Sequence, residues 1–165
     1  MLGIDPGTRV VGYGAVVASA RGPRLFGAGV LKPGAGLDVP ARLSVILSEF
    51  EELLREVRPD VVVVEQAFVS RNLQSALRIG EGRGIILAAA ARFGSRIVQF
   101  APAVAKKALV GNGAADKTQV AAMVAEALGL AEAPKPLDAS DALALALAHV
   151  LRSKHAARLA PAKRT

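Results

Sequence analysis

The sequence predicts an α/β domain built on a mixed five-stranded sheet that helices flank. Three short apolar segments near the N-terminus are separated by turn residues, which favours an antiparallel three-strand meander. From residue 60 onward, short β-branched segments alternate with helical patterns, which favours parallel pairing. The 165 residues have room for one such domain and not for a second of useful size.

The first half of the chain contains four of the predicted strands. Strands are predicted over 2–5, 10–18 and 24–32, because turn residues such as Asp5-Pro6-Gly7-Thr8 separate the apolar segments. A loop rich in Gly and Pro then leads to a helix over 41–57, whose apolar residues recur at helical spacing. The valine-rich strand 60–66 follows this helix.

The second half is predicted to be mainly helical. We expect, in order, a helix over 70–93, a strand over 96–100, and helices over 102–109, 116–128 and 138–152. Alternating Ala and Leu in the last segment would also suit a strand. Both residue types are strong helix formers and acidic residues precede them, so we predict a helix. The domain should therefore span 1–152, followed by a basic, disordered tail over 153–165.

The net charge of +7 is concentrated in two regions. Residues 66–115 carry seven basic side chains and one acidic one, and the tail from 152 onward carries five basic side chains and no acid. This distribution suits a polyanion held by its backbone, although a solvated surface with a solubilising tail explains it equally well. The absence of cysteine excludes disulfides. No apolar run approaches ~20 residues and no signal peptide is evident, so we expect a cytoplasmic protein.

Four carboxylates lie where predicted elements begin or end. Asp5 ends the first predicted strand, Glu65 closes a run of four valines, and Asp138 and Asp141 open the last helix. Positions i and i+3 of a helix share a face, so the last two acids can act together. Four converging carboxylates repel one another unless a cation neutralises them. Oxygen ligands without Cys or His select Mg²⁺ or Mn²⁺, which is the metal chemistry of phosphodiester cleavage.

Each acid also has an ordinary structural explanation. Asp5 precedes Pro-Gly and is favoured there by turn hydrogen bonding alone. Asp138 at an N-cap with Asp141 three residues later is close to a capping box, which would explain both. Glu65 is less easily explained in this way, because a carboxylate directly after a buried strand must reach water, a partner or a metal. The conjunction of all four favours a functional site.

Several sequence blocks, in order, resemble the RuvC family of crossover junction endodeoxyribonucleases. The resemblance covers residues 2–150. It rests on the following blocks: Gly3-Ile4-Asp5-Pro6-Gly7-Thr8-Arg9-Val10-Val11-Gly12-Tyr13-Gly14, Val64-Glu65-Gln66-Ala67-Phe68, Ser75-Ala76-Leu77-Arg78, Arg83-Gly84, Val110-Gly111-Asn112-Gly113, Ala115-Asp116-Lys117-Thr118-Gln119-Val120 and Asp138-Ala139-Ser140-Asp141-Ala142-Leu143-Ala144.

The resemblance implies an RNase H-like homodimer that resolves Holliday junctions by paired nicks. The family's four metal-binding, catalytic carboxylates fall on Asp5, Glu65, Asp138 and Asp141. They would hold Mg²⁺, with Mn²⁺ as a substitute and two ions per active site. A branch-migration complex of the RuvA and RuvB type is the implied partner beside the four-way DNA junction.

Five residues are candidates for DNA contact. Lys117 lies at the start of a predicted helix, where the dipole disfavours a cation, so its position favours a functional role. It matches a basic residue near the family's active site, and Phe68 matches an aromatic near the junction bases. The other three candidates lie in the basic region: Arg71, Lys106 and Lys107. Arg78 and Arg83 are expected to divide between the DNA surface and the dimer interface.

Three other functions are compatible with parts of this sequence. A nuclease of the same fold could act on structured RNA. A phosphate-binding ATPase of the actin and sugar-kinase type shares the Asp-x-Gly-Thr loop, but it needs two such domains. A non-catalytic junction-binding protein would not need four intact acids.

Overall fold

The computed structural model describes residues 1–7, 9–66 and 73–159, with side chains to residue 153. Five strands form one mixed sheet in the order β3-β2-β1-β4-β5. The antiparallel meander is formed by β1 (Leu2–Pro6), β2 (Val11–Ser19) and β3 (Gly22–Leu31). Parallel pairing adds β4 (Val61–Glu65) beside β1, and β5 (Arg96–Phe100) beside β4. The predicted mixed sheet is confirmed.

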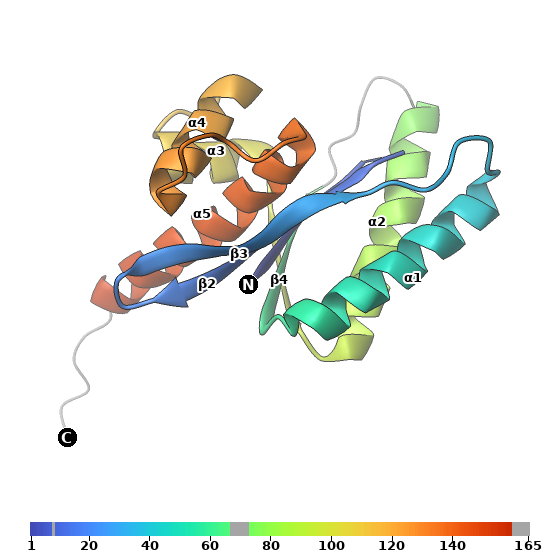
Figure 1. Cartoon of the computed structure of the whole chain (residues 1–165), viewed down its shortest axis with the longest axis horizontal. Helices are drawn as coiled ribbons and strands as arrows, with labels where there is room; N and C mark the ends of the chain where they lie inside the picture. Colours follow the sequence, from blue (N-terminus) through green and yellow to red (C-terminus); the bar gives the residue numbers. More distant parts are fainter. Residues whose placement is uncertain (8, 67–72, 160–165) are drawn as a thin grey trace.

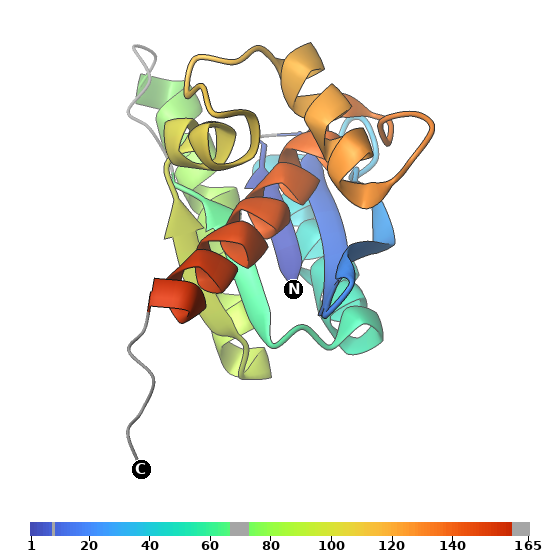
Figure 2. The same cartoon turned by 90° about the vertical axis from the view of Figure 1, so that its left-hand side faces the viewer.

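Helices cover both faces of the sheet (Figure 1). On one face lie α1 (Val39–Val57) and α2 (Leu73–Phe93). On the other face lies α5 (Leu137–Leu159), against which α3 (Pro102–Val110) and α4 (Lys117–Leu128) pack. Figure 2 shows α5 running diagonally across the sheet. Three layers result, with the sheet in the middle.

Strand alternation decides which face each acid occupies. Successive side chains of a strand point to opposite faces. Ile4 and Val64 belong to the core beneath α1 and α2, whereas Val63 packs with residues of α5. Asp5 and Glu65 each follow a residue of the first core, so both side chains belong on the α5 face.

The helix α5 is buried on nearly all sides. From Ala142 to Ala148 every residue is buried, because the sheet covers one side of the helix and α3 and α4 cover the other. This two-sided burial explains the continuous Ala/Leu composition. The helix predicted here, rather than a strand, is confirmed.

Three glycines let α5 approach the sheet closely. An added Cβ at Gly3 or Gly12 would overlap the backbone carbonyl of Ala142 or Asp138, and one at Gly14 would lie 2.5 Å from Leu143 Cγ. Gly3 and Gly14 are opposite one another across β1 and β2. The missing side chains thus form a groove that receives the helix backbone.

The last helix differs from its prediction at both ends. It begins at Leu137, so Asp138 lies inside the first turn and is not the N-cap that the capping alternative required. It continues to Leu159, so residues 153–159 are helical rather than irregular, and the predicted boundary at residue 152 falls inside α5. Residues 160–165 lie outside the described part. Among the described residues, no helix is long and apolar enough to cross a membrane.

Candidate active site

Two parallel strands bring the first two acids to the same end of the sheet. The β1–β4 register places Ile4 opposite Val64, so the next residues, Asp5 and Glu65, are neighbours. Ile4 and Val64, which precede the two acids, are fully buried. Each carboxylate therefore stands where its strand leaves the core.

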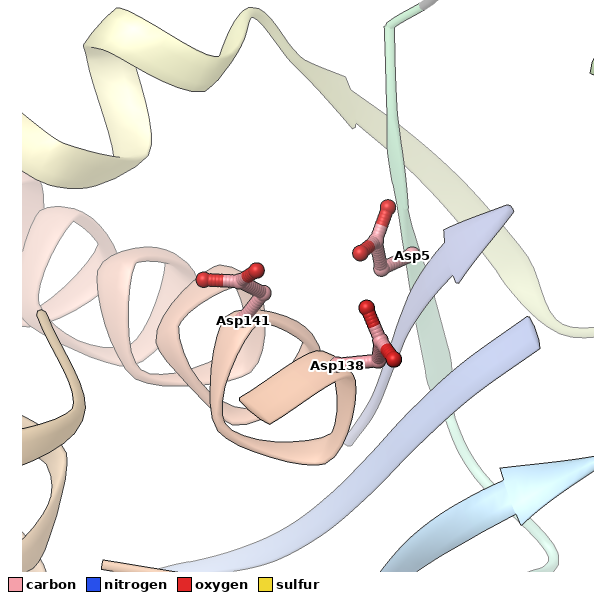
Figure 3. Close-up of side chains that lie close together, drawn as sticks. All are labelled: Asp5, Asp138 and Asp141. Carbon is pink, nitrogen blue, oxygen red and sulfur yellow. The ribbon is translucent and has the colours of Figure 1, made fainter. Parts of the chain in front are cut away.

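The start of α5 supplies the other two acids. Figure 3 shows Asp138 and Asp141 on the helix, with Asp5 of β1 across from them. One carboxylate oxygen from each of these three residues lies within 4.8 Å of the others. The Glu65 carboxyl is outside that group of three but hydrogen-bonds the Asp5 carboxyl. The structure thus brings all four predicted acids into one site.

Burial and mutual repulsion change the acidity of the two strand carboxyls. Burial, followed by the negative charge of Asp141, raises the pKa of Asp5 to about 6. Burial, followed by the charge of Asp5, raises the pKa of Glu65 to about 7. Without a cation, Asp5 therefore keeps its proton up to about pH 6 and Glu65 up to about pH 7, and a bound divalent ion would displace these protons.

Lys117 supplies a positive charge to the cluster. It is the first residue of α4, and its Nζ lies 2.6 Å from Asp141 Oδ2 and 3.7 Å from Asp138 Oδ1. The hydrogen bond to Asp141 is the largest cause that raises the pKa of Lys117. Asp116 caps the same helix in a capping box with Gln119, which fixes where α4 begins. The Asp-x-x-Gln pattern of this cap is a local signal that is visible in the sequence.

A cavity of about 240 Å³ opens beside the acids. Its lining includes Asp5, Glu65, Asp141 and the side chains of Lys106 and Lys117. The Lys106 ammonium donates to the Ala115 carbonyl oxygen at 2.6 Å, so this lysine borders the site while bracing the loop before α4.

The other predicted DNA contacts are not gathered in this cavity. Lys107 is exposed on α3 and is not among the residues that line it. Phe68 and Arg71 lie outside the described residues. The sequence also gives no hint of a contact that Arg83 makes with the Glu65 backbone, because it joins residues 18 positions apart through a main-chain atom.

The donor set fits a hard divalent cation. Carboxylate oxygens from β1, β4 and α5 converge, and neither Cys nor His lies among them. Hard cations such as Mg²⁺ and Mn²⁺ prefer oxygen ligands. The Lys117 ammonium already neutralises part of the acidic charge, so the site attracts cations.

The sheet order and the acids at the ends of β1, β4 and α5 define a class, the RNase H-like nucleases. A family model, crossover junction endodeoxyribonuclease RuvC, matches residues 1–149. The chain therefore belongs to the RuvC family.

Curated and solved relatives agree with this assignment. The crossover junction endodeoxyribonuclease RuvC of Chlorobaculum parvum is 43% identical over 153 residues, covering 92% of this chain and 81% of the relative. The Thermus thermophilus RuvC structure has a TM-score of 0.85 and 35% identity, covering 94% of this chain and 97% of that one. The same relative in complex with Holliday junction substrate gives a TM-score of 0.84 and 34% identity, covering 94% and 96%. The RNase H-like fold expected from the resemblance is confirmed.

Proposed function

We propose that this chain resolves four-way DNA junctions by paired, symmetric, Mg²⁺-dependent nicks in recombination and repair. The observation that carries the proposal is the convergence of the carboxylates of Asp5, Asp138 and Asp141, with Glu65 joined to Asp5. Membership of the RuvC family supports a nuclease acting on junctions. The related structure that holds a Holliday junction supports the same substrate for this chain.

The four acids would hold two divalent ions, with Mn²⁺ able to replace Mg²⁺. Such ions activate a water and stabilise the leaving 3′ oxygen in an in-line displacement. Asp5 and Glu65 must release their protons to serve as ligands. The pairing of β1 with β4 keeps their carboxylates close before DNA arrives. Lys117 would move from Asp141 to a phosphate oxygen once the ions neutralise the acids.

Basic residues around the cavity would hold the DNA backbone. Lys106 and Lys117 border the acids, and Lys107 extends the positive surface of α3. Phe68 and Arg71, in the segment after β4, remain predicted contacts to the junction bases and backbone. Phosphate contacts of this kind position a duplex without reading its sequence.

A homodimer would place two such sites symmetrically on one junction. A two-fold dimer is the simplest assembly in which one acidic cluster per chain cuts two equivalent strands. The sequence leads us to expect the interface on the helical segment 70–93, with Ile85, Ile86, Leu87 and the alanines as its apolar surface. Ile86, Ala89 and Ala90 are instead buried in the chain's own core, and Leu87 packs partly against it. These residues are therefore not free to meet a partner.

The exposed face of α2 offers a different surface. Leu73 and Leu77 are 68% and 61% exposed, and they are one turn apart on the helix. Farther along the helix, Gly80, Gly84 and Ala88 are exposed, and an added Cβ at either glycine would meet open space. Exposed leucines beside small residues suit close packing against a second helix.

A RuvA and RuvB type complex remains the expected branch-migration partner in a cytoplasmic setting.

The decisive experiment is cleavage of a synthetic four-way DNA junction in the presence of Mg²⁺. We expect two symmetric nicks, no cleavage in EDTA, and junction binding in both conditions. Structured RNA of similar size serves as the competing substrate. Preferential RNA cleavage would replace junction resolution with RNA processing.

Substitution of the acids provides the matched test. Asp5→Asn, Glu65→Gln, Asp138→Asn and Asp141→Asn should each abolish nicking and leave junction affinity nearly unchanged, because they remove metal ligands rather than phosphate contacts. Asp60→Asn, an acid outside the cluster that precedes β4, is the control and should cleave normally. Nicking at the wild-type rate by Glu65→Gln would sink the assignment of the site.

A further inference from the structure

Arg83 of α2 connects the ends of two strands beside the acidic cluster. Its Nε donates to the backbone carbonyl of Glu65 at 3.1 Å. Its Nη2 donates to the side-chain oxygen of Gln99 on β5. One guanidinium thus bridges the last residue of β4 and the neighbouring strand, from a helix on the opposite face of the sheet to α5.

The Glu65 carbonyl faces the side of β4 on which β1 lies. The Gln66 N–H donates to the Phe100 carbonyl oxygen at 2.8 Å, so the backbone of Gln66 faces β5. Backbone polar groups of successive strand residues point to opposite sides. Glu65 therefore directs its own N–H and carbonyl toward β1.

The strand β1 cannot supply the hydrogen bond that this carbonyl needs. Ile4 lies opposite Val64, so continuing the same register would place Asp5 opposite Glu65. In a parallel ladder, the Glu65 carbonyl would then accept from the N–H of the residue after Asp5, which is residue 6. Residue 6 is proline, which has no N–H. Parallel pairing with β1 accordingly ends at Ile4 and Val64.

A carbonyl that loses its ladder partner needs another donor to hold its position. The Arg83 guanidinium is that donor, because its Nε reaches the carbonyl from α2. The Glu65 side chain extends from the same residue toward Asp5, so the backbone that Arg83 fixes is the base of a predicted metal ligand.

We propose that Arg83 is a positioning residue for the metal site, replacing the N–H that Pro6 lacks and fixing the strand end that carries Glu65. The inference rests on the proposed metal-dependent nuclease function. A planar guanidinium with donors in a rigid fork suits two acceptors on separate strands, whereas the single ammonium of a lysine does not. Removing Arg83 should loosen Glu65 and weaken metal binding, without removing a metal ligand or a phosphate contact.

The test measures Mn²⁺ binding to the full chain without DNA, from the loss of the free Mn²⁺ signal in electron paramagnetic resonance. Arg83→Gln should bind Mn²⁺ about 10-fold more weakly than wild type, the size of effect seen when groups that orient metal ligands are removed. Arg83→Lys, which keeps the charge but cannot span both acceptors, should lie between the two. The control is Arg92→Gln on the same helix, whose side chain is 79% exposed and pairs only loosely with Glu51 at 3.8 Å.

Junction cleavage as a function of Mn²⁺ concentration is the second readout. The half-saturating concentration should rise in parallel with the binding defect, while junction affinity and its salt dependence stay at wild-type values. Wild-type Mn²⁺ affinity in both Arg83 variants would overturn the proposal. So would normal Mn²⁺ binding combined with a salt slope lower by about one, since that result would make Arg83 a phosphate contact.

The inference and the function on which it rests fail in different ways. A wild-type protein that binds Mn²⁺ but leaves four-way junctions uncut would contradict the proposed function. Weaker Mn²⁺ binding by Arg83→Gln in that same protein would still support the positioning role. If Arg83→Gln does not fold, Arg83→Lys alone decides, and wild-type Mn²⁺ affinity in that variant overturns the proposal.

Discussion

Asp5 and Glu65 make the stability of the metal-free protein depend on pH. Their pKa values are raised from 3.8 and 4.5 to about 6 and about 7, chiefly by burial. At a pH between the ordinary and the raised pKa values, the folded chain holds protons that the unfolded chain has released. Stability from this source is therefore complete below about pH 4 and is lost as the pH rises through 6 and 7.

Glu65→Gln should remove part of this dependence, because an amide stays neutral at every pH. At pH 8, without metal, we expect the variant to melt about 2 °C or more above wild type, which corresponds to roughly 1 kcal/mol for a chain of this size. At pH 5 the two proteins should melt close together. Scanning calorimetry in EDTA at both pH values checks this, and a constant difference between the proteins at pH 5 and 8 would contradict it.

The same protons should control cleavage by wild type at low Mg²⁺. Metal binding requires deprotonated carboxylates, so the nicking rate should rise between pH 6 and pH 8 when Mg²⁺ is far from saturating. Saturating Mg²⁺ should shift this rise to lower pH, because the metal competes with the protons. A profile that is the same at low and high Mg²⁺ would assign the pH dependence to another group.

Lys117 is subject to two opposing effects. Its position at the start of α4 costs about 0.3–1 kcal/mol through the helix dipole, which alone predicts that removing it leaves the fold intact or slightly stabilised. Its ion pairs with Asp141 and Asp138 contribute about 0.2–1 kcal/mol in a partly exposed setting. The two terms are similar in size, so Lys117→Ala should change the unfolding free energy by less than about 1 kcal/mol.

The effect of Lys117→Ala on cleavage should be much larger than its effect on stability. If the ammonium contacts the phosphate beside the metals, the rate should fall strongly, by about 100-fold if it stabilises charge in the transition state. Lys135→Ala is the control, because Lys135 is 83% exposed and its one ion pair within the described residues is with Glu132. An unchanged melting temperature together with unchanged cleavage would return Lys117 to the solvated surface.

At the scale of elements, the sequence predicts the order of strands and helices and misses their ends. Hydrophobic periodicity marks every strand and helix seen, because burial on one or two faces imposes it. The start of α5 is misplaced by one residue and its end by seven, since the residues after Val150 include the good helix formers Ala, Leu, Lys and Arg, which need no burial to continue a helix. Contacts between main-chain and distant side-chain atoms, such as Arg83 with Glu65, leave no local pattern to read.

Glycines in β1 and β2 set the distance between α5 and the sheet, and hence between the acids. Gly12→Ala would drive a methyl group into the Asp138 backbone, and backbone atoms cannot move aside as a side chain can. We expect a loss of about 1–3 kcal/mol in unfolding free energy and weaker Mn²⁺ binding, because the start of α5 must shift. Gly27→Ala on β3 is the control, since its added Cβ meets nothing within 4 Å. Equal stability of the two variants would show that α5 adjusts without cost.

At the scale of the whole molecule, the proposed paired cleavage requires the acidic cluster of a chain to act on each of two equivalent strands. The exposed face of α2 is the surface that we propose for the second copy, and Leu77 is one of its two exposed leucines. Leu77→Glu should leave the melting temperature of the monomer nearly unchanged, because the side chain is 61% exposed. It should shift the proposed dimer toward monomer in sedimentation at micromolar concentration, because each protomer would bring a charge into an apolar interface.

Loss of the dimer should separate the two nicks in time. On a supercoiled plasmid that extrudes a cruciform, paired nicks linearise the plasmid, whereas single nicks only relax it. Leu77→Glu should therefore yield mainly relaxed plasmid, and Leu151→Glu, a leucine 41% exposed on α5, should still yield linear product. Because each chain keeps its own four acids, the rate of single nicks should fall less than the rate of paired ones. A Leu77→Glu protein that is monomeric yet still linearises the plasmid at the wild-type rate would rule out the requirement for a dimer.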